Sequence, residues 1–193
     1  MTQRGPWNIA ETEKYAHITY FFNGGREIVF PGEDRVLIPS PKVATYDSTP
    51  LMSAKETTDK LLDAISSNKY SFLLINFANA DMLGHTGNIP ATIKAVEFVD
   101  SRLKMIVNSA SANNYNLFIT ADHGNAEEML VDEQVNDEHT TNPVPFIFCQ
   151  KAQTSEDLGF GTLADIAPTI LYTMKLTPSE EMTGKNLLKQ VYG

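Results

Sequence analysis

The chain has 193 residues, of which 42% are hydrophobic and 20% are charged, as in a globular protein with one hydrophobic core. Its formal net charge of −9 argues against a nucleic-acid partner, because phosphates need a basic face. The single Cys149 excludes a disulfide within these residues and favours a reducing, cytoplasmic location. No apolar stretch predicts a signal peptide or a membrane span.

The first quarter of the chain predicts two short strands after a linker. Residues 1–9 are largely polar with a Gly-Pro pair, so we expect a linker or cloning remnant there and one domain over 10–193. Aromatic and β-branched residues over 14–22 predict a strand, on which His17 is expected to pack rather than to bind a metal. A second strand over 35–38 ends at two prolines, and Lys42 follows on that stiff loop.

Helix and strand signals alternate along the middle of the chain. Ser53 and Glu56 form a capping-box pattern that predicts the start of a helix. The continuous apolar run 71–77 has the length of a strand and suits the centre of a parallel sheet. Residues 89 to about 111 predict the longest helix, because their apolar residues recur on one helical face.

The alternation continues to the C-terminus. The expected elements are a strand at 116–119, a helix starting within 125–129, an acidic loop at 131–138, a strand at 144–149, a helix at 162–172 and a short helix after Gly184. These signals together predict an α/β fold with a mostly parallel sheet and helices on both faces.

Acidic and imidazole side chains gather where the predicted strands end. Asp122 and His123 follow the strand at 116–119, Asp81 and His85 follow the run 71–77, and His139 precedes the strand at 144–149. Such ligands without thiolate suit zinc, manganese or a similar divalent ion. Five ligands exceed one tetrahedral site, so the sequence favours two ions, which can clamp both oxygens of a phosphoryl transfer. The alternative is a set of unconnected loop-end residues that only cap and hydrogen-bond.

Longer motifs extend from about residue 10 to about residue 188. They lie at 10–15, 21–25, 37–47, 76–79, 81–87, 120–127, 139–145 and 163–169. In these motifs the chain resembles the C-terminal part of the cofactor-independent (2,3-bisphosphoglycerate-independent) phosphoglycerate mutase family, within the alkaline phosphatase superfamily. The Asp-His-Gly motif at 122–124 indicates only the superfamily. The Pro-Ser-Pro-Lys motif at 39–42 and the Glu-Thr-Glu-Lys motif at 11–14 are more specific.

The resemblance implies a glycolytic isomerase that moves phosphate between the 3- and 2-hydroxyls of glycerate through a phosphoserine. It implies one Mn²⁺ on Asp81, His85 and His139. It implies a second Mn²⁺ on Asp122 and His123, shared with a further aspartate and the nucleophilic serine. Lys42 would contact and neutralise the transferred phosphoryl group.

The resemblance also implies partners that these residues do not include. In the family the serine, the first metal-binding aspartate and an inserted arginine-rich substrate-binding domain lie upstream, and no serine here has a matching position. We therefore expect a C-terminal metal-binding part that needs the N-terminal half and is inactive alone. The alternatives are another phosphomutase, such as a phosphopentomutase, a phosphodiesterase, or a non-catalytic metal-binding module.

Overall fold

The computed structural model describes residues 5–151 and 158–188, and the chain divides into two compact units. The first unit contains the segment up to Asn113 together with His123–Pro143. The second contains Asn114–Asp122 and the segment from Val144 onward. None of the described helices is long and apolar enough to cross a membrane.

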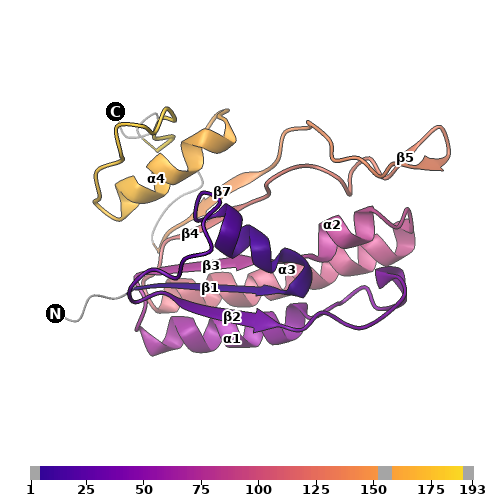
Figure 1. The fold of residues 1–193 in the computed structure, drawn as a ribbon, viewed down its shortest axis with the longest axis horizontal. Coiled ribbons are helices and arrows are strands. Elements are labelled where there is room, and N and C mark those ends of the chain that lie inside the picture. The colour runs from indigo at the N-terminus through magenta and orange to yellow at the C-terminus, as the bar shows by residue number, and fades with distance from the viewer. Residues whose placement is uncertain (1–4, 152–157, 189–193) are drawn as a thin grey trace. The chain divides into compact units, whose positions relative to one another are not determined.

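A parallel sheet of three strands lies at the centre of the first unit (Figure 1). Strand β1 (Pro6–Glu11) lies between β2 (Asp34–Ile38) and β3 (Phe72–Asn76), and Ile9 pairs with Val36 on one side and with Ile75 on the other. The predicted strands at 35–38 and 71–77 are confirmed, although β1 and not β3 is central. The expected α/β class with a parallel sheet is also confirmed.

The central strand occupies residues for which the sequence predicted a linker. Residues 6–9 belong to β1, so that part of the predicted linker is wrong, and Ile9 and Ala10 are fully buried. The polar Asn8 is also buried, and its Nδ2 donates to Glu33 Oε1 at 3.0 Å. This hydrogen bond satisfies the Nδ2 donor of a side chain whose burial would otherwise disfavour a central strand, while the buried Asn8 Oδ1 has no hydrogen-bond partner among the described residues.

The predicted strand at 14–22 is helical instead. A 3₁₀ turn (Thr12–Lys14) leads into a π-helix (His17–Phe21), and the Thr19 hydroxyl donates to the Tyr15 carbonyl at 2.8 Å. The His17 ring packs 5.4 Å from that of Phe21. Aromatic and β-branched residues suit a strand mainly through packing, so local propensity yields here to the tertiary context.

Helices α1, α2 and α3 all belong to the first unit. Helix α1 (Ala54–Ser67) begins where expected, although the Ser53 hydroxyl accepts no capping hydrogen bond from the helix and instead donates to the Pro39 carbonyl. Helix α2 (Asn79–Gly84) follows β3, and α3 (Ile89–Ala112) confirms the predicted longest helix. Leu83 of α2 is buried against Ala91 and Ala95 of α3, so the short α2 is held by the long one.

The remaining segment of the first unit, His123–Pro143, is a long loop that contains a hairpin of two short strands. Strand β5 (Leu130–Val131) pairs with β6 (Gln134–Val135) across a turn in which Asp132 and Glu133 both have positive φ. The helix predicted from 125–129 is therefore wrong, and the acidic loop at 131–138 contains this hairpin. Hydrogen bonds of the Glu127 carboxylate and a bridge between Gly124 and Thr140 hold this loop in place of a helix.

In its described residues the second unit contains one antiparallel pair of strands and one α-helix. Strand β4 (Leu117–Thr120) pairs with β7 (Phe146–Cys149), and η4 (Leu163–Asp165) continues into α4 (Ile166–Thr173), so these predicted elements are confirmed. The Asp165 carboxylate accepts from the Thr162 and Lys185 amides, both at 2.7 Å. The short helix predicted after Gly184 is absent from residues 185–188, and 189–193 lie outside the described residues.

Candidate metal centre

Asp81 and His85 reach one point because α2 places them one turn apart. The His85 amide donates to the Asp81 carbonyl at 3.2 Å, and His85 Nε2 lies 3.1 Å from Asp81 Oδ1. Helix α2 begins just after β3, at the carboxyl edge of the parallel sheet, where α/β proteins place their ligands. The expectation that a four-residue spacing aligns these two side chains is confirmed.

His139 completes a three-residue cluster within the first unit. Its Nε2 lies 3.2 Å from Asp81 Oδ1 and 3.2 Å from His85 Nε2. Among the described residues these three form the group of carboxylate and imidazole side chains that could hold a metal ion. We call Asp81, His85 and His139 the metal cluster.

The donor atoms of the metal cluster fit a divalent ion. Ligand atoms about 2.1 Å from a metal lie about 3.0 to 3.4 Å apart for angles between about 90° and the tetrahedral value. The separations of 3.1 and 3.2 Å in the cluster fall in this range. One carboxylate and two imidazoles also form the nitrogen and oxygen donor set that zinc, manganese and similar ions accept.

Of the two residues expected at a second ion, His123 belongs to the first unit and Asp122 to the second. His123 Nε2 lies 4.0 Å from Asp81 Oδ1, and the His123 ring stacks on that of His139 with centroids 3.6 Å apart. His123 is therefore beside the metal cluster. Asp122 belongs to the second unit, so the geometry of the first unit does not include it, and its role stays a prediction.

Among the described lysines, Lys14 binds the carboxylate of the metal cluster. It is 6% exposed, and its ammonium donates to Asp81 Oδ2, the oxygen opposite the one that faces the two imidazoles. Burial raises the pKa of Asp81, but the hydrogen bond and charge of Lys14, together with the charges of His85 and His123, outweigh it, so the pKa lies below its ordinary value. Lys14 therefore keeps this carboxylate ionised and oriented.

Lys42, the lysine expected at the phosphoryl group, is exposed on the loop after β2. No hydrogen bond or ion pair joins it to the metal cluster in the described part of the chain. Two residues before Lys42, Ser40 donates to Glu11 Oε2 at 2.9 Å and so ties this loop to the end of β1. The Pro-Ser-Pro motif thus has a structural function in the first unit.

Asn125 and Asp137 also contact the metal cluster, and neither was expected from the sequence. The buried Asn125 places Nδ2 3.2 Å from His85 Nε2 and 3.4 Å from Asp81 Oδ1. A Cβ on Gly84 would lie 1.6 Å from Asn125 Oδ1, so only glycine leaves room for this amide. On the outer side, Asp137 Oδ1 lies 3.1 Å from His85 Nδ1. Such a carboxylate fixes the histidine tautomer so that Nε2 is free to bind a metal.

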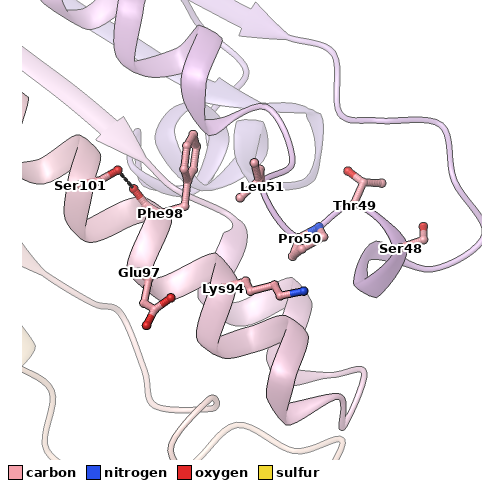
Figure 2. A pocket seen from close by; sticks show the side chains of 8 residues that line it. All are labelled: Ser48, Thr49, Pro50, Leu51, Lys94, Glu97, Phe98 and Ser101. Carbon is pink, nitrogen blue, oxygen red and sulfur yellow. Dashed lines mark hydrogen bonds between the residues drawn. The ribbon is translucent and has the colours of Figure 1, made fainter.

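A separate surface hollow of about 670 Å³ contains none of these residues. It is lined by the loop that precedes α1, which includes Leu51, and by one side of α3, which includes Phe98 (Figure 2). Lys94 and Glu97 are its charged side chains. With no imidazole and a single carboxylate, it lacks the donors for a metal, so the candidate functional site is the metal cluster.

Most of the chain is similar to part of longer known proteins. The chain is 55% identical over 182 residues to a 2,3-bisphosphoglycerate-independent phosphoglycerate mutase of Cellvibrio japonicus, covering 93% of the chain and 35% of the relative. It is 52% identical over 185 residues to the protein of that name from Ehrlichia canis, covering 95% and 37%. The chain thus spans about a third of the length of these relatives.

The chain is also similar to a solved structure and matches a family model. A crystal structure of Leishmania mexicana phosphoglycerate mutase at low cobalt concentration superposes with a TM-score of 0.85 at 29% identity, covering 94% of this chain and 36% of that one. Residues 4–178 match the metalloenzyme superfamily. The resemblance found in the sequence is therefore confirmed, and the chain belongs to the metalloenzyme superfamily.

Proposed function

We propose that the chain supplies the metal-binding part of a phosphoglycerate mutase that interconverts 3- and 2-phosphoglycerate through a phosphoserine. The observation that carries this proposal is the metal cluster, with Lys14 bound to its carboxylate. The names of the relatives favour this reaction over that of a phosphopentomutase or a phosphodiesterase. A glycolytic role and a cytoplasmic location are part of the proposal.

In this proposal Asp81, His85 and His139 hold one divalent ion, and Asp122 and His123 contribute to a second, both being Mn²⁺. When bound, the ions would favour the alkoxide form of the serine and neutralise charge on the phosphoryl oxygens. Lys14 holds the Asp81 carboxylate in place from its buried side. Lys42 is proposed as a contact of the phosphoryl group from its exposed loop.

The phosphate acceptor is proposed to come from outside these 193 residues. Among the described residues, no serine hydroxyl hydrogen-bonds to Asp81, His85 or His139. The relatives are about three times as long as the chain, so they have room for a serine and for a domain that holds a doubly charged substrate. Parts that act as a unit lose nearly all activity when one is removed.

The proposal is tested by converting 3-phosphoglycerate to 2-phosphoglycerate at saturating Mn²⁺. We expect no detectable turnover by the 193-residue chain. We expect activity when the upstream part of the Cellvibrio japonicus relative is added as a separate polypeptide, and none with the His85→Ala variant in the same mixture. Turnover of about 10 per second by the chain alone would show that one of its own serines is the nucleophile.

A further inference from the structure

We propose that Glu127 is a positioning residue that sets the distance between His139 and the loop of His123 and Asn125. This inference rests on the proposed metal centre and adds a residue to it. No hydrogen bond or ion pair joins Glu127 to Asp81, His85 or His139, all of which are described residues; its partners are Asn125, Thr140 and Asn142. Glu127 acts through the backbone segments that contain His123 and His139.

The Glu127 carboxylate joins two segments that are far apart in the sequence. Its Oε2 accepts from the Asn125 amide at 2.8 Å. Its Oε1 accepts from the Thr140 hydroxyl and from Asn142 Nδ2, the latter at 3.1 Å. One side chain thus binds both the turn after His123 and the segment that begins at His139.

The two segments are also in direct backbone contact at this point. The Thr140 amide donates to the Gly124 carbonyl at 2.9 Å, and the two residues form an isolated β-bridge. A Cβ on Gly124 would lie 2.2 Å from both Glu127 Oε1 and Thr140 Oγ1. The carboxylate therefore fills the space left by the glycine, and any larger residue would push the segments apart.

A separation of the two segments would displace the imidazoles of His123 and His139, because each of these residues is adjacent to the bridge. His123 precedes Gly124 and His139 precedes Thr140, and their rings stack at 3.6 Å. Asn125 follows Gly124 and carries the buried amide beside Asp81 and His85. Separation of the segments would move His139 Nε2 away from Asp81 Oδ1, from which it lies 3.2 Å.

Glu127 suits this function because it remains charged. The Thr140 hydrogen bond is the largest cause that lowers the pKa of Glu127, to about 2, with further bonds from Asn142 and Asn125 outweighing the opposing effect of burial. Hydrogen bonds to an ionised carboxylate are stronger than those to a neutral acceptor. A neutral glutamine would also present an N–H group to donors at one of its two positions.

The test is the affinity of the metal-free 193-residue chain for Mn²⁺, measured by titration calorimetry. We expect Glu127→Ala and Thr140→Val each to weaken binding by about 10- to 100-fold, the range for residues that support metal ligands. Thr140→Ser, which retains the hydroxyl, should bind like the unmodified chain. Glu133→Gln, at the exposed tip of the β5–β6 hairpin, is the matched control and should also bind normally.

Two further readouts separate positioning from general stability. Circular dichroism in chelator should show that the variants are folded, and the visible absorption of bound Co²⁺ should change in Glu127→Ala and Thr140→Val but not in Thr140→Ser. If Glu127→Ala does not fold, Thr140→Val decides the question.

The outcomes also distinguish this inference from the proposed metal centre. Unchanged affinity and an unchanged Co²⁺ spectrum in Glu127→Ala or Thr140→Val would overturn the role of Glu127 while leaving the metal centre intact. Equal weakening in Glu133→Gln would overturn it as well, because the effect would then be one of net charge. Failure of the unmodified chain to bind any divalent ion would overturn the metal centre itself.

Discussion

The two sides of the metal cluster are built in different ways. Asp81 and His85 are on a short helix that follows a sheet strand and packs on α3, so regular structure alone aligns them. His139 is on a segment without helix or named strand, which is held by one bridge and by the Glu127 carboxylate. A ligand on a loop therefore needs dedicated supporting residues, whereas a ligand on a packed helix needs few.

The largest expected effect is on the helical side. His85→Ala should weaken Mn²⁺ binding by at least about 100-fold, because it removes one of three converging donors from an incomplete coordination shell. Titration of the metal-free chain measures this change. His17→Ala is the matched control, since His17 packs against Phe21 in the π-helix, and it should bind normally. Unchanged binding by His85→Ala would remove α2 from the metal centre.

Lys14 provides the next test, because its ammonium binds the Asp81 carboxylate on the same, helical side of the metal cluster. Lys14→Met leaves the Asp81 carboxylate, 13% exposed, without its cation, and breaking such a buried pair costs about 3 kcal/mol or more. We expect this loss of unfolding free energy in chelator and a smaller loss with saturating Mn²⁺, which can replace the missing charge. Denaturant unfolding under both conditions measures it. An equal loss with and without metal would mean that Lys14 supports the fold but not the metal site.

Lys42 allows the two lysines to be compared directly. Lys42→Ala should change the unfolding free energy by less than about 0.5 kcal/mol, as is usual at exposed positions. If Lys42 contacts the phosphoryl group, the same change should reduce turnover of the complete enzyme at least tenfold, or about 1.4 kcal/mol. Equal turnover would leave Lys14 as the lysine of the site.

The smallest expected effect is that of Asp137, which contacts His85 from the solvent side. Its side chain is 88% exposed, so its hydrogen bond competes with water, and we expect Asp137→Asn to weaken Mn²⁺ binding only about threefold. Calorimetric titration beside Asp132→Asn, in the neighbouring hairpin turn, gives the comparison. A loss as large as that of His85→Ala would mean that the outer carboxylate is itself a ligand.

The difference between the two sides also explains what the sequence could predict. The Asp81–His85 pair was predictable because a buried apolar run followed by a four-residue spacing describes α2 directly. His139 was predictable as a ligand by its residue type and its place before a strand. Glu127 was not, because it was assigned to a helix, and its true partners, Thr140 and Asn142, are contacts distant in the chain.

The N-terminal region shows a second reason for a missed residue. The polar Asn8 concealed the central strand, because its partner Glu33 lies 25 residues away. Without β1, Lys14 was placed at the start of a predicted strand and not just beyond the carboxyl end of a real one. The Glu-Thr-Glu-Lys motif at 11–14 contained the signal, since the resemblance singled out that stretch.

The central claim is that these residues form one nearly complete metal site. It is tested most directly by titrating the metal-free chain with Mn²⁺ and counting the ions bound. Asp81, His85 and His139 converge within the first unit, whereas Asp122 and His123 are expected to need two further partners for a second ion. We predict one tightly bound ion per chain. Two ions of equal affinity, or no tight binding at all, would contradict the account.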